Sequence, residues 1–309
     1  MKTRLLLIPV FFVWYCCCAV SQDINSALKL ETKRNADESV NILARTYSPG
    51  TFGIVMEFTG LTNTSHPRWS YASVRGSGTV ATLRPLSSEQ GVGYSYVYTY
   101  NRGRANPRHS ASVTYRLPFS AGKTCLCNTL PYLWEDIRDR PEEWHPWMFH
   151  MEKGDTVFAM RKGRVVDIHD GEDPVSDSAV VSYSSHSNKM IIEHEDGTLA
   201  YYNVLEKNSF MVKVGDIVYP DTPLALAGSF DKIYYQVRVN VRMLRVDFGK
   251  MSDSGDLSDA LYYSDINPVF MTEKGPAALI PKESYKSVVT VDIVEAEMTK
   301  KEIKKRAGM

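Results

Sequence analysis

The chain has 309 residues, and its 36 Lys plus Arg are balanced by 36 Asp plus Glu, so the formal net charge is zero. A neutral chain offers no general electrostatic attraction for nucleic acids or anionic membranes, which argues against partners of both classes. With 43% hydrophobic and 11% aromatic residues, the composition predicts globular, β-rich cores, and the length accommodates two domains.

Residues 1–21 have the pattern of a secretory signal peptide. Lys2 and Arg4 form a short positive region, residues 5–20 are an almost unbroken apolar run, and Ala19-Val20-Ser21 offers small residues for cleavage. The run is shorter than the roughly 20 residues that a membrane helix needs. We therefore expect an exported, periplasmic or secreted protein that begins near Gln22 and has no membrane span after cleavage.

The five cysteines fall into two groups. Cys16, Cys17 and Cys18 leave lipidation open, although the preceding Val13-Trp14-Tyr15 lacks the small residues of a lipidation signal. Cys125 and Cys127 are separated by one residue, which is too close for an unstrained disulfide, and the pair is two ligands short of a structural zinc site. We expect two buried or free thiols.

The first half of the mature chain, residues 22–121, has the pattern of extended strands separated by turns such as Ser48-Pro49-Gly50. One strand carries four alternating tyrosines, which share one face because side chains alternate along a strand. They are Tyr94, Tyr96, Tyr98 and Tyr100. Two interpretations stay open: a row that stacks on the sugar rings of a ligand, or the half-buried face of a β-sandwich.

The second half contains a series of motifs. Residues 191–197 read IIEHEDG, residues 200–205 read AYYNVL, residues 212–218 read VKVGDIV, and residues 232–237 read KIYYQV. This order resembles the LytM/lysostaphin-type zinc metallopeptidases, whose pattern runs I-x-H-x-D-G-x-x-x-x-Y-A-H-L, then V-K-V-G, and ends on an H-x-H-F-E-V strand. The turn glycines and the hydrophobic spacing agree over about 90 residues.

The resemblance extends to the first half, because a tyrosine-alternating strand and a Y-x-L-P-F-x-x-G exit precede the LytM-like part, as in secreted two-domain members with an immunoglobulin-like module. It implies an all-β protein: signal peptide (1–21), immunoglobulin-like β-sandwich (22–121), LytM-like antiparallel domain of the duplicated hybrid motif type (122–275), and a C-terminal strand with a basic helical tail (276–309). Within the LytM-like domain we expect residues 156–160 to form a hairpin with 163–168, and residues 190–195 with 198–205 around Asp196-Gly197.

A catalytic zinc needs three protein ligands and an open position for water. The resemblance places Met148 where the family has its metal-binding Asp, and Tyr234 at the metal-binding second His of H-x-H. Lys232 falls at the first His, and Asn203 at the His of Y-A-H-L. Neither Trp144 nor Asp139, at the usual upstream spacings, is a His. We therefore expect no bound cofactor and no catalytic residue.

The seven histidines offer one way to rebuild a metal site. His145 and His150 lie on either side of Met148, and His150 should share its strand face. A ligand from the closing strand would still be missing. Five tyrosines are instead expected to fill the volume that the zinc cluster leaves: Tyr201, Tyr202, Tyr219, Tyr234 and Tyr235.

Two functions follow from the resemblance. The first is an exported non-catalytic protein that binds peptidoglycan or regulates a cell-wall hydrolase, as relatives with degenerate LytM-like domains do. The second is an active zinc endopeptidase that cleaves peptidoglycan cross-bridges through relocated ligands. Because function depends on the site and not on the scaffold, the missing ligands favour the first.

At the C-terminus, residues 284–298 alternate apolar and polar side chains as an extended strand would. Residues 299–309 are strongly basic, and we expect a solvated, frayed tail.

Overall fold

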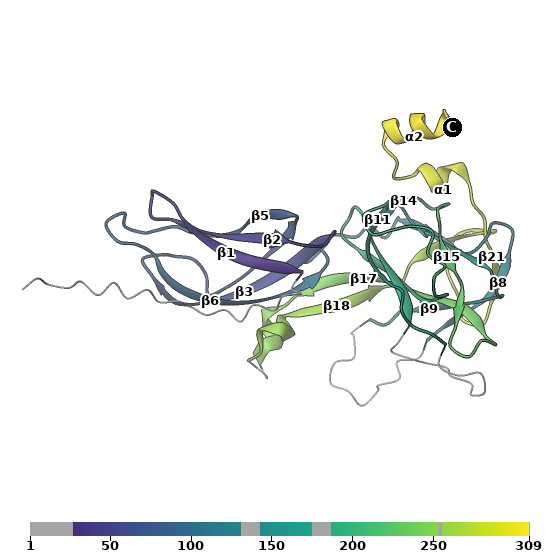
Figure 1. Cartoon of the computed structure of the whole chain (residues 1–309), viewed down its shortest axis with the longest axis horizontal. Helices are drawn as coiled ribbons and strands as arrows, with labels where there is room; N and C mark the ends of the chain where they lie inside the picture. The colour runs from purple at the N-terminus through teal and green to yellow at the C-terminus, as the bar shows by residue number, and fades with distance from the viewer. Residues whose placement is uncertain (1–26, 131–142, 175–186, 253–254, 309) are drawn as a thin grey trace, which may run out of the picture.

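The computed structural model describes residues 27–130, 143–174, 187–252 and 255–308. The chain is an all-β protein whose sheets are almost entirely antiparallel. Figure 1 shows a small unit of early strands at one end, a larger unit at the other, and two short helices at the C-terminal end of the chain. Within the described residues, no helix has the length and apolar character needed to cross a membrane.

The first unit packs two three-stranded sheets face to face, in the orders β1-β2-β5 and β4-β3-β6. The strands are β1 (Leu28–Arg34), β2 (Val40–Thr46), β3 (Thr51–Thr62), β4 (Trp69–Arg75), β5 (Ser77–Leu83) and β6 (Gly93–Arg102). Alternating side chains from both sheets close one core, in which Leu28, Ile42 and Ile54 are fully buried. The predicted turn before β3 is confirmed, since Gly50 there has a φ of 97°, a region that favours glycine.

The second unit is built on a ten-stranded sheet with the order β14-β11-β12-β13-β17-β9-β8-β21, in which β16 and β18 also pair with β17. Its strands are β8 (Thr124–Thr129), β9 (Trp147–Met151), β11 (Gly163–His169), β12 (Asn188–Glu193), β13 (Leu199–Leu205), β14 (Ile217–Val218), β16 (Gly228–Ser229), β17 (Tyr235–Val246), β18 (Leu261–Ile266) and β21 (Ser284–Lys286). Valines at alternate positions of β17 pack into the core.

Two smaller sheets contribute to the same core. One pairs β10 (Thr156–Phe158) with β15 (Pro223–Leu226), and the other has the order β20 (Gly275–Ala278), β19 (Val269–Thr272) and β7 (Thr114–Arg116). Tyr115, Leu117 and Phe119 are therefore part of the larger core, although sequence analysis places them in the sandwich. The strands of the sandwich end at Arg102.

One of the two predicted hairpins is confirmed and the other is wrong. Strands β12 and β13 pair around the Asp196-Gly197 turn as expected. Strand β10, however, pairs with β15, and β11 pairs with β12 and β14. Gly163 explains the close approach of β11 to β12, because a Cβ there would lie 2.5 Å from a side-chain carbon of Ile192.

The two units are joined by buried contacts. Strands β17 and β18 extend from the large sheet towards the sandwich (Figure 1), where Leu244 and Val55 share a small core with the 3-10 helices η1 (Phe248–Ser252) and η2 (Leu257–Ala260). The Tyr263 hydroxyl donates to the Arg102 carbonyl at 2.7 Å.

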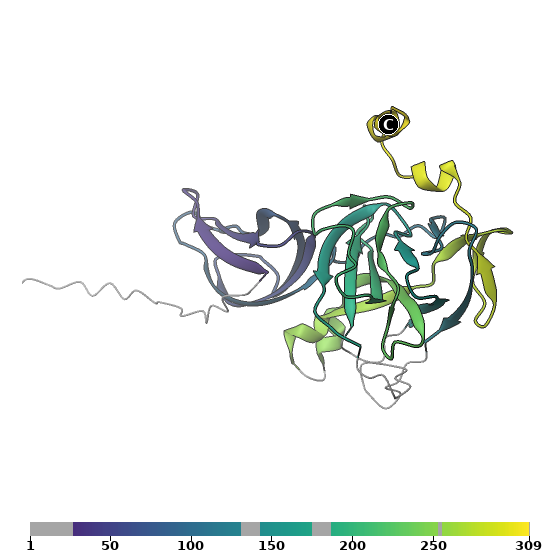
Figure 2. The same ribbon diagram turned by 45° about the vertical axis from the view of Figure 1, so that its right-hand side comes forward.

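Residues 291–295 of the C-terminal segment are helical where sequence analysis expects a strand. After β21, α1 (Val291–Glu295) begins at the side-chain cap of Thr290, and α2 (Lys300–Ala307) begins at a capping box formed by Thr299 and Glu302. Polar caps of this kind start a helix whatever the alternation of the flanking residues. In Figure 2, α2 stands away from the sheets, and none of its residues is buried.

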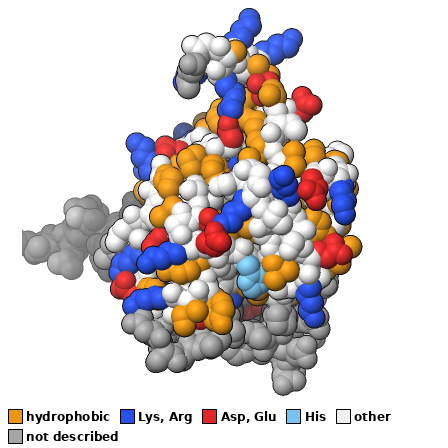
Figure 3. Space-filling model, turned by 90° about the vertical axis from the view of Figure 1, so that its right-hand side faces the viewer, with side chains coloured by type: hydrophobic (Ala, Val, Ile, Leu, Met, Phe, Trp, Pro, Cys, Tyr) orange, Lys and Arg blue, Asp and Glu red, His pale blue; other side chains and the backbone are white. Residues whose placement is uncertain are grey.

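Ion pairs tie this segment to the second unit. Arg161 binds Glu297 at 2.6 Å, Lys162 binds Glu302 at 2.9 Å, and Arg306 binds Asp221. The face of the molecule in Figure 3 mixes basic and acidic side chains with apolar ones, as the zero net charge leads one to expect.

Cys125 and Cys127 are buried, unpaired thiols on the inner face of β8. Burial raises the pKa of Cys125 to about 12 and that of Cys127 to about 11. Both thiols therefore stay protonated at neutral pH, and the expectation for this pair is confirmed.

Candidate functional site

The large sheet aligns four residues in one row across four strands. Met148 of β9 pairs with Arg238 of β17, Arg238 pairs with Asn203 of β13, and Asn203 pairs with Lys189 of β12. Directly opposed residues in antiparallel strands project from the same face of a sheet. The row therefore brings together Met148 and Asn203, two of the positions that the resemblance assigns to metal binding and catalysis, with an arginine between them.

Strand β17 adds further polar side chains to this face. Gln236, Asn240 and Arg242 alternate with valines that enter the core, and Gln236 pairs with His150 of β9. Gln236 and Arg238 are each only 7% exposed, and Asn240 is 5% exposed. Burying amide and guanidinium groups is costly unless they find partners. We call this face, with Met148, His150, Asn203, Gln236, Arg238, Asn240 and Arg242, the polar sheet face.

Its arginines are held by aromatic and polar neighbours. The Arg238 Nε donates to the Gln236 Oε1 at 2.9 Å, and its guanidinium lies 4.9 Å from the centre of the Phe230 ring. Arg242 donates to the Asp265 Oδ1 at 3.0 Å and lies 5.8 Å from the ring centre of Trp144. Trp144 stands at a position where the resemblance would place a metal-binding His, and its ring lies near the cation of Arg242.

His150 shares the face of Met148, as predicted. Its Nε2 lies 3.3 Å from the Asn128 Nδ2, and burial lowers its pKa, so the ring is neutral at pH 7. Among the described residues, no three His, Cys, Asp or Glu side chains lie together as a metal site requires. Asp139 lies outside the described residues.

Lys232 and Tyr234 lie in a turn before β17 and not on the polar sheet face. Asp231 holds this turn by accepting hydrogen bonds from the backbone N–H groups of Ile233 and Tyr234, each at 2.9 Å. Burial would raise the Asp231 pKa, but these hydrogen bonds outweigh it and lower the pKa. Strand pairing therefore puts Arg238, and not Tyr234, beside Met148.

The expectation that tyrosines fill a vacated metal cavity is wrong for Tyr234, which is 55% exposed. Tyr202 is fully buried, but it faces the apolar core, where its hydroxyl accepts a hydrogen bond from the Met160 backbone N–H at 2.7 Å. The side chain of Tyr201, next to it, faces the polar side, where it lies 5.1 Å from the Arg242 guanidinium.

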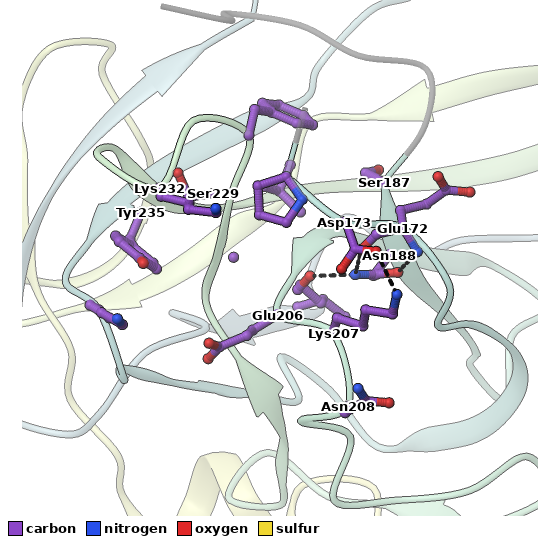
Figure 4. A pocket seen from close by; sticks show the side chains of 16 residues that line it. Glu172, Asp173, Ser187, Asn188, Glu206, Lys207, Asn208, Ser229, Lys232 and Tyr235 are labelled. Atoms are coloured by element: carbon purple, nitrogen blue, oxygen red, sulfur yellow. Dashed lines mark hydrogen bonds and ion pairs between the residues drawn. The ribbon is translucent and has the colours of Figure 1, made fainter. Parts of the chain in front are cut away.

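A pocket of about 370 Å³ opens at the ends of β12, β13 and β17 (Figure 4). Figure 4 shows Lys232, Ser229 and Tyr235 on one side, with Glu206, Lys207 and Asp173 across from them. Lys207 forms an ion pair with Asp173 at 2.8 Å. Phe230 lines the pocket, and its ring also contacts the Arg238 guanidinium, so the pocket adjoins the polar sheet face.

The tyrosine row of β6 packs against the core of the sandwich. Neighbouring rings lie 6.3 to 6.5 Å apart between centres, and all four tyrosines contact buried residues of that core. Burial raises the pKa of Tyr96 to about 12. This geometry is that of the half-buried face of a sandwich, and a ligand contact at Tyr94, Tyr96, Tyr98 or Tyr100 stays a prediction.

The predicted non-ligand, His194, is fully buried and structural. Its Nδ1 lies 2.8 Å from the Thr198 Oγ1, and burial lowers its pKa to about 3. Asp196 in the same turn binds Arg161 at 2.8 Å and His109 at 3.0 Å. Because Arg161 also holds Glu297, this network connects the turn to the C-terminal segment.

Sequence reasoning missed the polar positions of β17 and the pocket residues. The strand reads YQVRVNVR, with a polar residue at every second position from Gln236 to Arg242. A strand whose apolar positions alternate with Gln, Arg and Asn is a readable signal of a polar face. The pocket residues Lys153, Glu206 and Tyr235 carry no such signal, because three separate loops and strands bring them together.

No family model matches the chain, and no protein among the curated sequences matches it. Several solved structures are similar: a protein described as an M23 peptidase from Pseudomonas aeruginosa (13% identity, TM-score 0.30, 61% of this chain and 82% of that one), a zinc-containing peptidase from Vibrio cholerae (12%, 0.26, 70% and 75%), and Csd3 from Helicobacter pylori (11%, 0.29, 90% and 84%). At these values the similarity says nothing about the site.

Proposed function

We propose that the protein is an exported, non-catalytic relative of the LytM-type peptidases that binds peptidoglycan or regulates a cell-wall hydrolase. The observation that carries the proposal is the pairing of Arg238 with Met148 on one side and Asn203 on the other. In the resemblance these two neighbours stand at an Asp ligand and a catalytic His. An arginine stays protonated at any physiological pH, so it repels a divalent cation at this place.

The neighbouring side chains support the same conclusion. Methionine, asparagine and glutamine are poor ligands for zinc, which prefers His, Cys, Asp and Glu. The Trp144 ring lies 5.8 Å from the Arg242 guanidinium and its Nε1 donates to the Leu130 carbonyl at 2.8 Å, so its ring is held by the protein itself. Hydrolysis by a metal-activated water needs a set of metal ligands, and the described residues contain no group of three His, Cys, Asp or Glu side chains that could hold a metal.

The same chemistry favours binding. Guanidinium and amide groups are suited to carboxylates and peptide bonds, because an arginine presents several N–H donors in a fixed fork. Such donors lie on one face of β17, where Gln236, Arg238 and Asn240 are buried and the Arg242 side chain is 24% exposed. Cell-wall peptides carry both carboxylates and peptide bonds, so this face matches them without a catalytic group.

A sedimentation assay on purified peptidoglycan sacculi tests the proposal. The mature chain should sediment with the sacculi, and no soluble muropeptides should appear in the supernatant. The matched variant is Arg242→Lys, at the partly exposed arginine of this face, which keeps the charge but loses the fork, and it should be retained more weakly than wild type.

Two other outcomes would overturn the proposal. If the chain stays in the supernatant, the proposed binding to the cell wall is wrong. If the chain also leaves the activity of an added cell-wall hydrolase unchanged, the proposed regulation of a hydrolase is wrong too. If muropeptides are released and a chelator stops the release, the protein is the zinc endopeptidase of the alternative interpretation.

A further inference from the structure

The pocket beside the polar sheet face contains three polar groups that have no partner in the described part of the chain. They are the Lys153 ammonium, the Glu206 carboxylate and the Tyr235 hydroxyl, all of which line the same cavity. Lys153 is exposed, whereas Glu206 and Tyr235 are half-buried. Lys207 and Asp173, by contrast, form an ion pair with each other. Among the described residues, Lys153, Glu206 and Tyr235 thus offer a cation, an anion and a phenol to this cavity.

The walls of the pocket are fixed by internal hydrogen bonds. The side-chain oxygen of Asn188 accepts from the backbone N–H groups of Gly171 and Glu172 at 2.9 and 2.8 Å, and its nitrogen donates to the carbonyls of Glu172 and Leu205. All polar atoms of this buried amide are therefore occupied. Asn188 connects residues 171 and 172 to Leu205 at the end of β13, next to Glu206.

The backbone around the pocket is strained. Of the seven non-glycine residues with positive φ in the described part of the chain, three line this cavity: Val204 (62°), Asn208 (59°) and Lys232 (62°). A β-branched residue in this region is rare, because its side chain crowds the backbone. The backbone of β16 approaches Val204 closely, since a Cβ on Gly228 would lie 2.8 Å from the Val204 carbonyl oxygen. Strain of this kind collects at binding and catalytic sites, where a particular geometry is maintained.

We propose that this pocket binds a small zwitterion, an amino acid or dipeptide or the charged end of a longer peptide, with its carboxylate at Lys153 and its ammonium at Glu206. The Tyr235 hydroxyl serves as a further hydrogen-bond partner. The volume of about 370 Å³ lies at the lower end of the range for ligand pockets, about 300 to 1,000 Å³, which fits a ligand of this size. The inference rests on the proposed function in its choice of a peptide as ligand.

Calorimetric titration of the full mature chain with three alanine dipeptides tests the proposal. Dialanine carries both charges, N-acetyl-dialanine lacks the ammonium, and dialanine amide lacks the carboxylate. Each blocked form should bind at least about tenfold more weakly than dialanine, because it loses one of the two charge-assisted contacts, the carboxylate at Lys153 or the ammonium at Glu206. Alanine and tetra-alanine distinguish a free small solute from the end of a longer peptide.

Two variants assign the charges. Glu206→Gln should bind dialanine about tenfold more weakly and should no longer distinguish it from N-acetyl-dialanine. Lys153→Gln should lose the distinction between dialanine and its amide. Glu195→Gln and Lys213→Gln, at exposed positions outside the pocket, are the matched controls and should bind like wild type. Equal melting temperatures of all four show that the fold is intact.

The inference is overturned if dialanine binds no better than its blocked forms, or if Glu206→Gln and Lys153→Gln bind it as wild type does. Sedimentation with sacculi separates this failure from a failure of the proposed function. Retention on sacculi without dialanine binding contradicts only the proposed ligand of the pocket. Dialanine binding without retention on sacculi contradicts only the proposed binding to the cell wall.

Discussion

The carboxylate of Glu193, in β12 of the larger unit, accepts two hydrogen bonds from Thr51, at the start of β3 in the sandwich. The Thr51 backbone N–H donates at 2.8 Å and its Oγ1 donates at 2.6 Å. Arg75 adds an ion pair at 2.8 Å, and the Glu193 side chain is 0% exposed. The two units are therefore joined by a buried, charged contact. Removing one partner of this contact should lower the free energy of unfolding.

Replacing Glu193 tests this joint. Glu193→Ala removes the acceptor of the backbone N–H and of the hydroxyl proton of the buried Thr51, which should lower the free energy of unfolding by about 3 kcal/mol. Urea denaturation followed by tryptophan fluorescence measures the change. Glu195→Ala, two residues along and exposed, should change it by less than about 0.5 kcal/mol. Equal effects of the two substitutions would show that the contact does not stabilise the fold.

Zinc analysis tests the interpretation of the polar sheet face. Because Arg238 lies beside Met148 and Asn203, the mature protein should purify without stoichiometric zinc, and EDTA should leave its melting temperature unchanged, since no folding energy comes from a metal. Plasma emission spectroscopy and a thermal scan provide both measurements. About one zinc per chain, lost in His150→Ala, would contradict this prediction.

The exposure of the tyrosines predicts very different costs of truncation. Tyr234 is 55% exposed, so Tyr234→Ala should change the free energy of unfolding by less than about 0.5 kcal/mol. Tyr202 is fully buried and its hydroxyl accepts from the Met160 backbone N–H. Tyr202→Ala should therefore cost about 3 to 5 kcal/mol. Chemical denaturation of both variants checks the ranking, and a large loss for Tyr234→Ala would mean that its side chain packs elsewhere.

Stability should depend on pH through His194. Burial, and then the charge of Arg161, lowers the pKa of His194 to about 3 in the folded state, whereas an unfolded histidine titrates near 6.5. Between these values the unfolded chain binds one more proton, so the free energy of unfolding falls as pH falls, by up to about 1.4 kcal/mol per pH unit. The contribution is fully present above about pH 6.5.

Urea denaturation at a series of pH values measures this slope. His194→Gln should remove most of it between pH 6 and pH 4.5, whereas His169→Gln, at an exposed position, should leave it in place. Wild-type stability that is flat over this interval would show that His194 titrates normally. The depressed pKa of Asp196, which burial alone would raise but the His109 and Arg161 contacts lower, acts in the same direction at lower pH.

Local patterns in the sequence were enough for several features. The all-β class follows from the short alternating runs and turn residues, and the hairpin around Asp196-Gly197 follows from a strong turn signal. The shared face of Met148 and His150 follows from the period of a strand. Met148 and Asn203 are singled out by the motif resemblance alone, which stays a prediction.

Only the tertiary structure decided which residue of the closing strand lies beside Met148. Tyr234, Gln236, Arg238 and Asn240 are separated by steps of two, so every one of them satisfies the period of a strand. A slip by two or four residues keeps the same face, and the local pattern cannot detect it. The register is fixed instead by long-range pairing of β17 with β9 and β13, which leaves Tyr234 in a turn and brings Arg238 to the centre of the row.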